Sequence, residues 1–252
     1  MKMVNRKAEA FVGIDLAFAK NKLLPICVCT ISDGLLTPLE LKSPRLKPPR
    51  GKGNAAAIET QEQRLFAREV LCWLGKVEEE FSLEVKVIAI DAPRSYGPRD
   101  SEIQMGECGI SYISTPTQEE FRQKVLNARI WINNGNKMNQ IPAANQLWML
   151  VGFALYRILS KQYRCIETYP NAIIHSMGYD GEHKSTRNGF NNQVKLVANH
   201  LGLCTLEQDL NRSGYGSRHD KLDAYLSAWV ASLPACGRRH YGSPQCAIWV
   251  PA

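Results

Sequence analysis

The sequence predicts an α/β fold in which one mixed sheet is flanked by helices. One observation is that three apolar runs, each typical of a buried strand, end in an acid: residues 11–14 before Asp15, 87–90 before Asp91 and 164–166 before Glu167. A second is the helical pattern between the first two runs, because parallel strands require a crossover of this kind.

The chain opens with a predicted three-strand antiparallel meander. The first strand covers about residues 11–17, and further apolar runs cover residues 23–31 and 35–41. Asp33 and Gly34 separate the last two runs, and Asp-Gly between apolar segments is a strong signal for a tight hairpin.

A basic segment, residues 42–54, follows the meander. It holds five lysines and arginines, several prolines and glycines, and no acid. Such a composition predicts no regular element, so we expect a solvated loop. The alternative is a loop that contacts phosphate groups.

Helical patterns account for most of the remaining chain. Thr60 and Gln63 fit a capping box before apolar residues at helical spacing through residue 81. Residues 92–160 are predicted to form a helical insertion, with a second capping box at Thr117 and Glu120 and a strongly amphipathic helix at 147–159, whose Trp148 is expected in the core. Later helices are predicted from Pro170, at 193–201 and at 217–233, all within one domain spanning residues 1–252.

Composition narrows the class of protein. The 252 residues are 44% hydrophobic and 22% charged, which suits one globular domain. The net charge of +7 favours an anionic partner, of which nucleic acid is the commonest. Eight cysteines without a C-x-x-C pair, no secretory signal and no membrane-length apolar run predict a cytoplasmic protein with reduced cysteines and no membrane partner.

The acids at the strand ends are the main functional signal. Parallel strands present their carboxyl ends at one edge of a sheet, where ligands bind, so these acids are expected to converge. Clustered carboxylates repel one another unless a cation holds them, and Mg²⁺ or Mn²⁺ is the simplest such cation. Gly13 and Ala89 lie beside Asp15 and Asp91 on the strand faces and predict open space above the sheet.

The predicted metal ligands are Asp15 as the bridging carboxylate, Asp91 as the second and Asp223 of the last helix as the third. Asp220 lies three residues before Asp223, so either can face the site; the alternative for Asp220 is a first-turn acid favoured by the helix dipole. Glu167 either joins the site or accepts hydrogen bonds from the backbone of the following helix. The predicted catalytic set is therefore Asp15, Asp91, Glu167, Asp220 and Asp223.

Basic residues near these acids are candidates for binding substrate. Arg94, Arg99, Lys184 and Arg187 are placed near the rim of the site, where they can hold phosphates. The alternative for each is a solvated loop charge. His219 is a candidate for proton transfer or product release, against a partly buried structural histidine.

Four motifs in order resemble a known family. They are residues 13–17 (Gly-Ile-Asp-Leu-Ala), 90–93 (Ile-Asp-Ala-Pro), 167–170 (Glu-Thr-Tyr-Pro) and 219–224 (His-Asp-Lys-Leu-Asp-Ala). Together they resemble domain-of-unknown-function family 429, predicted to be a ribonuclease H-like nuclease. The resemblance implies a ribonuclease H-like sheet of three antiparallel and two parallel strands. The basic segment and residues 236–252 depart from its pattern.

The sequence thus predicts a metal-dependent nuclease that hydrolyses DNA or RNA at a two-metal carboxylate site. One alternative is an ATP-dependent phosphotransferase of the actin and sugar-kinase type, which shares this strand layout. Those proteins usually follow the first Asp with a glycine-rich turn, whereas Asp15 is followed by Leu16 and Ala17. The other alternative is a non-catalytic nucleic-acid-binding module.

Overall fold

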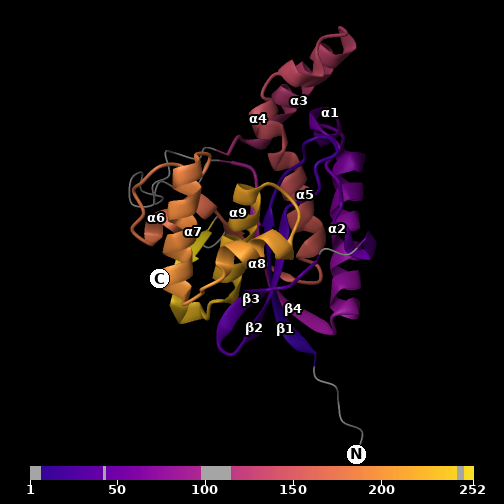
Figure 1. Ribbon diagram of the computed structural model, residues 1–252. Coiled ribbons are helices and arrows are strands. Elements are labelled where there is room, and N and C mark those ends of the chain that lie inside the picture. Colours follow the sequence, from indigo (N-terminus) through magenta and orange to yellow (C-terminus); the bar gives the residue numbers. More distant parts are fainter. Residues whose placement is uncertain (1–6, 42–43, 98–114, 243–246) are drawn as a thin grey trace, which may run out of the picture.

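The computed structural model describes residues 7–41, 44–97, 115–242 and 247–252. Their strands form one mixed sheet (Figure 1). The strands are β1 (Ala8–Asp15), β2 (Ile26–Ser32), β3 (Leu35–Pro38), β4 (Leu83–Asp91), β5 (Arg164–Thr168), β6 (Arg238–Tyr241) and β7 (Ile248–Pro251).

The strand order across the sheet is β3-β2-β1-β4-β5-β7-β6. The first three strands form the predicted antiparallel meander, with Asp33 and Gly34 at positive φ (52° and 79°) in the turn. Strand β4 pairs in parallel with β1, and β5 pairs in parallel with β4. The predicted α/β class and the ribonuclease H-like arrangement of these five strands are confirmed.

Strands β6 and β7 were not predicted. They pair with each other in antiparallel fashion, and β7 pairs in parallel with β5, so residues 238–241 and 248–251 supply part of the sheet. Both strands are four residues long, and β6 reads Arg-Arg-His-Tyr. The basic β6 carries no alternating apolar pattern from which a strand can be recognised, and the apolar β7 is too short for such a pattern to appear.

Helices cover both faces of the sheet. The helices are α1 (Asn54–Ala57), α2 (Thr60–Glu80), α3 (Gln118–Asn133), α4 (Ala144–Leu147), α5 (Met149–Leu159), α6 (Pro170–Ser176), α7 (Arg187–Leu201), α8 (Leu206–Ser213) and α9 (Arg218–Ser232). Short 3₁₀ turns occupy Pro44–Leu46, Met138–Gln140 and Ala235–Gly237. None of the helices in the described parts is both long and apolar enough to cross a membrane.

Two apolar cores lie on opposite faces of the sheet. On one face α2 and α5 pack over Val12, Ile14 and Ile90. On the other face α9, supported by α6, α7 and α8, packs over Phe11 and Ala89. The long α2 carries Phe66, Val70, Trp73, Leu74 and Val77 to the first face, at the predicted helical spacing.

The predicted helical insertion has two parts. Helix α5 belongs to the crossover that connects β4 to β5 along the chain, and it packs in the core. Helix α3 extends away from the body of the protein (Figure 1). The capping box at Thr117 and Glu120 is confirmed. The one at Thr60 is wrong: α2 begins after Glu59, and the Gln63 side chain instead donates 2.7 Å to the Ala57 carbonyl at the end of α1.

The described part of the basic segment, residues 44–54, exposes Arg45, Lys47 and Arg50 but packs its apolar residues against the protein. Leu46 and Pro48 are buried, and the Trp73 indole donates to the Leu46 carbonyl at 2.9 Å. Lys52 pairs with Glu62 and Glu69 of α2. Acids on a neighbouring helix, which the local composition does not reveal, compensate part of the segment's charge.

Candidate functional site

Asp15 and Asp91 end neighbouring parallel strands and are register partners. Adjacent strands lie about 4.8 Å apart, so the two carboxylates begin side by side at the carboxyl edge of the sheet. Alternation along each strand puts Asp15 with Phe11 and Asp91 with Ala89, on the face that α9 covers. The predicted convergence of these two acids is confirmed.

Helix α9 brings Asp223 to the same face. It packs directly on β1 at Gly13, where a Cβ atom would lie 1.8 Å from the Ala224 carbonyl oxygen and 2.4 Å from the Ala228 amide nitrogen. The sequence suggested open space above the small residues of β1 and β4, but these residues leave none. They admit the backbone of α9, and with it Asp223, which is 6% exposed.

The electrostatics at Asp15 show that the three acids interact. Burial raises the pKa of Asp15 well above its ordinary value, and the negative charges of Asp91 and Asp223 raise this pKa further. Lys184 lowers it but does not compensate. The edge of the sheet is thus a place where negative charge is costly and a cation would be stabilised.

Lys184 is closer to these acids than a rim residue would be. Its Nζ atom lies 2.5 Å from Oδ1 of Asp223, and the two side chains are only 15% and 8% exposed. Burial alone would lower the pKa of Lys184, but Asp223, Asp91 and Asp15 outweigh that effect and raise it. The lysine is therefore held in its charged form within the carboxylate cluster.

Asp220 takes the alternative role that the sequence allowed. Its carboxylate accepts hydrogen bonds from the backbone and hydroxyl of Ser217 at 2.7 and 2.6 Å, in a capping box at the start of α9. Lys22 lies 3.0 Å from the same carboxylate. Although burial opposes it, these partners lower the pKa of Asp220. The Ser-x-x-Asp spacing is the sequence signal for this cap.

Glu167 lies on the other face of the sheet. Along β5, Cys165 belongs to the core under α5 and Ile166 to the core under α9, so Glu167 alternates to the α5 face. It is 4% exposed, and its Oε2 atom accepts a hydrogen bond from the backbone of Arg94 at 3.0 Å. The sequence suggested a donor in the helix that follows Glu167. The donor instead belongs to the segment after β4.

Thr168 occupies the position on β5 that Glu167 was expected to hold. Because Glu167 is the register partner of Ile90, strand alternation places the next residue, Thr168, beside Asp91 on the α9 face. The Thr168 hydroxyl donates 3.0 Å to Ser227 of α9. Both hydroxyl groups are buried. Asp223 and Ser227 are four residues apart on α9, so that helix faces the sheet edge with both side chains.

The other predicted substrate-binding residues are placed less centrally. Arg94 and Arg187 are exposed, and Arg99 lies outside the described residues. His219 is also exposed, not partly buried, with its Nε2 atom 3.5 Å from Asp220. Burial raises the pKa of Asp223 above its ordinary value. Lys184 and, less strongly, His219 lower this pKa without cancelling the effect of burial. Of the described members of this set, Lys184 is the one that lies among the acids.

A pocket of about 200 Å³ opens beside the carboxylates. Asp91, Glu167 and Thr168 line it from the sheet, and Trp148 and Met149 line it from the start of α5. Trp148 was predicted in the core, but it is partly exposed and its indole donates to the Asn145 carbonyl at 2.8 Å. Both faces of the sheet edge thus contribute an acid to one opening.

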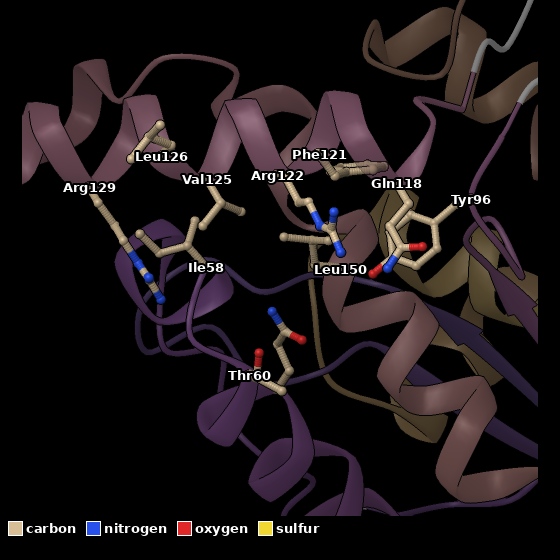
Figure 2. Close-up of a pocket in the computed structure, with 11 residues that line it drawn as sticks. Ile58, Thr60, Tyr96, Gln118, Phe121, Arg122, Val125, Leu126, Arg129 and Leu150 are labelled. Atoms are coloured by element: carbon tan, nitrogen blue, oxygen red, sulfur yellow. The ribbon is translucent and has the colours of Figure 1, made fainter.

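A second pocket, of about 330 Å³, lies between α3 and the start of α2. Figure 2 shows Arg122 and Arg129 extending from α3 toward it. Arg122 already pairs with Glu119 and Arg129 with Glu59, both at 3.1 Å. Since both guanidinium groups have carboxylate partners, this pocket is less suited to an anion than its two arginines suggest.

The ends of β4 and β5 are joined by a buried hydroxyl. The Tyr156 hydroxyl lies 3.3 Å from the carbonyls of Ile90 and Ala92, and 3.2 Å from that of Ile166. Its single hydrogen can be donated to one of these carbonyls at a time. The hydroxyl thereby links the strand that ends in Asp91 to the strand that contains Glu167.

We expect Tyr156→Phe to lower the free energy of unfolding by about 1–3 kcal/mol, because buried carbonyls lose their donor. Urea titration followed by circular dichroism measures this change. Tyr96→Phe is the matched control, because Tyr96 is 37% exposed, and we expect it to stay within about 0.5 kcal/mol of the parent. Equal effects of the two substitutions would show that the Tyr156 hydroxyl joins nothing.

The carboxylates suit a hard divalent cation in donor type. Oxygen ligands are those that Mg²⁺ and Mn²⁺ prefer, and a cation would offset the burial and the acidic neighbours that raise the pKa of Asp15. As the described side chains stand, however, no three His, Cys, Asp or Glu residues converge as a ready-made metal site. Asp223 pairs with Lys184, whereas Asp15 and Asp91 lie side by side as register partners at the strand ends.

Comparison with known proteins identifies the family. A family described as protein of unknown function (DUF429) matches residues 49–245, a segment that contains Asp91, Lys184 and Asp223 and begins after Asp15. No curated protein and no solved structure matches the chain. Because the match covers more than half of the chain and agrees with the resemblance of its motifs, the protein belongs to the DUF429 family.

Proposed function

We propose that the protein is a cytoplasmic, divalent-metal-dependent phosphodiesterase that hydrolyses nucleic acid. One observation carries the proposal: Asp15 and Asp91 are register partners at the carboxyl ends of parallel strands, and α9 packs closely enough to add Asp223. The net charge of +7 supports a polyanionic substrate. Six described cysteines are free, which supports a reducing compartment.

In this proposal Asp15 and Asp91 hold Mg²⁺ or Mn²⁺. The bound ion supplies Lewis-acid stabilisation of the charge that develops on the phosphoryl oxygens. Lys184 positions Asp223 and adds a fixed positive charge beside the reacting phosphate. Arg94 and His219, both exposed at this edge, bind the backbone phosphates, and His219 is the available group for proton transfer near Asp223.

The test is cleavage of end-labelled single- and double-stranded DNA and RNA in Mg²⁺ or Mn²⁺, with and without EDTA. We expect cleavage that requires the metal. Asp91→Asn should reduce the cleavage rate by more than roughly 10–100-fold, which is the cost of losing a residue that only supports a metal ligand. Glu84→Gln, on the same strand and exposed, is the control that should retain activity.

Other outcomes would separate the alternatives. Cleavage that persists in EDTA would contradict the metal requirement. Binding of nucleic acid without cleavage, unchanged in Asp91→Asn, would favour a non-catalytic module. Tight binding of ATP in calorimetry together with phosphate transfer would favour the phosphotransferase.

A further inference from the structure

Lys184 lies where a cation would otherwise be needed. Its ammonium pairs with Asp223 at 2.5 Å, and the charges of Asp91 and Asp15 also act on it. Both the lysine and Asp223 are largely buried. A buried ammonium cannot leave its carboxylate partner without exposing an uncompensated charge, which is strongly destabilising.

The loop that carries Lys184 is built to hold it there. The Tyr179 hydroxyl donates 2.8 Å to the Glu182 carbonyl, and the Thr186 hydroxyl donates 2.7 Å to the Glu182 carboxylate. Thr186 also caps α7 by accepting from the Gly189 amide at 2.9 Å. A Cβ atom on Gly189 would lie 2.2 Å from the His183 carbonyl oxygen, so only glycine lets the loop close against α7.

Lys184 already pairs with the carboxylate that α9 would offer to a second divalent ion. Asp220 does not take its place, because its carboxylate pairs with Lys22 at 3.0 Å. A second divalent ion beside Lys184 would repel the ammonium and would compete with it for Asp223.

We propose that this site binds one divalent cation, at Asp15 and Asp91, and that the Lys184 ammonium takes the place of the second cation of a two-metal site. The inference rests on the proposed function, because it concerns the same carboxylates. The Lys184 ammonium then supplies the positive charge at the second cation position without a metal. The dependence of activity on metal concentration therefore reflects the binding of a single ion.

The test counts Mn²⁺ bound to the protein by calorimetry and by electron paramagnetic resonance. We expect one Mn²⁺ per chain in the parent protein and two in Lys184→Met, where Asp223 becomes available. Two ions about 3.5–4 Å apart share ligands, so the variant should also give an exchange-coupled Mn²⁺ signal that the parent lacks. Neither readout requires activity.

Three further variants sharpen the count. Lys195→Met, an exposed lysine of α7, should keep one ion. The double variant Lys184→Met with Asp223→Asn should return to one, because the second ion needs Asp223. Gly189→Ala keeps the lysine but displaces its loop, and we expect it to gain the second ion as Lys184→Met does.

Two ions in the parent protein would overturn the inference and leave the proposed function standing. One ion in both the parent and a folded Lys184→Met would also overturn it, since the lysine would then hold no cation position. No bound Mn²⁺ in the parent would overturn the proposed function itself. The parent count alone decides the first and third outcomes even where a variant does not fold.

Discussion

Asp15→Asn is expected to abolish metal-dependent cleavage while making the folded protein more stable. The substitution removes a ligand from an ion that contributes several kcal/mol of charge stabilisation, so we expect the rate to fall by about 1000-fold or more. Without metal, it also removes a carboxylate whose ionisation is opposed by burial, Asp91 and Asp223. Cleavage assays and urea unfolding in EDTA measure the two effects.

The stability effect has a defined dependence on pH. Because the pKa of Asp15 is higher in the folded than in the unfolded chain, the folded state binds the proton more tightly. Stability of the parent should therefore fall as pH rises from the ordinary aspartate pKa through the raised one. The Asp15→Asn variant should lack this part of the pH dependence. Its gain in stability over the parent should be largest at pH values above the raised pKa of Asp15.

Asp33→Asn is the matched control for both measurements. Asp33 lies at positive φ in the exposed β2–β3 turn, a conformation that asparagine adopts readily. We expect neither rate nor stability to change. If Asp15→Asn cleaved nucleic acid at the parent rate, Asp15 would not belong to the site. If the variant were less stable than the parent, partners that stabilise the Asp15 carboxylate would outweigh its acidic neighbours.

Gly13→Ala is expected to destabilise the fold by about 3 kcal/mol or more, because overpacking is costly where rigid atoms must move. The added methyl group would meet two backbone atoms of α9 at 1.8 and 2.4 Å, which no side-chain rotation can relieve. Moving α9 also separates Asp223 from Asp15, so metal affinity should fall with stability. Urea unfolding and Mn²⁺ titration of the folded fraction measure these changes.

Gly75→Ala makes the same substitution in the exposed part of α2, where an added Cβ meets nothing within 4 Å. Alanine is the better helix former, so we expect this variant to gain about 0.5–1 kcal/mol. Opposite signs for the two glycines would establish that contact with α9 is the cause. If Gly13→Ala were as stable as the parent, α9 would not need the bare backbone of β1.

The convergence of Asp15 and Asp91 followed from the sequence because it depends on one rule of parallel sheets. The face on which Glu167 lies did not follow, since a shift of one residue in the strand reverses every side chain. Thr168 was the residue on the required face, and a threonine after a short apolar run gives no functional signal. Only its contact with Ser227 marks it.

Lys184 was assigned to the correct region but not to its position. Its position beside Asp223, which lies 39 residues later in the sequence, depends on a loop whose closure requires Gly189 and the capping of α7 by Thr186. The pattern placed the start of that helix at residue 193, whereas α7 begins at Arg187. Lys184 was therefore expected at a rim rather than among the acids.

The contact of β1 with α9 joins the first strand of the chain to the last of its helices. Contacts so distant in sequence form late, because all residues between Asp15 and Arg218 must be synthesised before both partners exist. We expect a growing chain on the ribosome to carry Asp15 and Asp91 without Asp223. The proposed hydrolytic centre would then be completed only after α9 has emerged, so the two strand-end acids would precede their helical partner during synthesis.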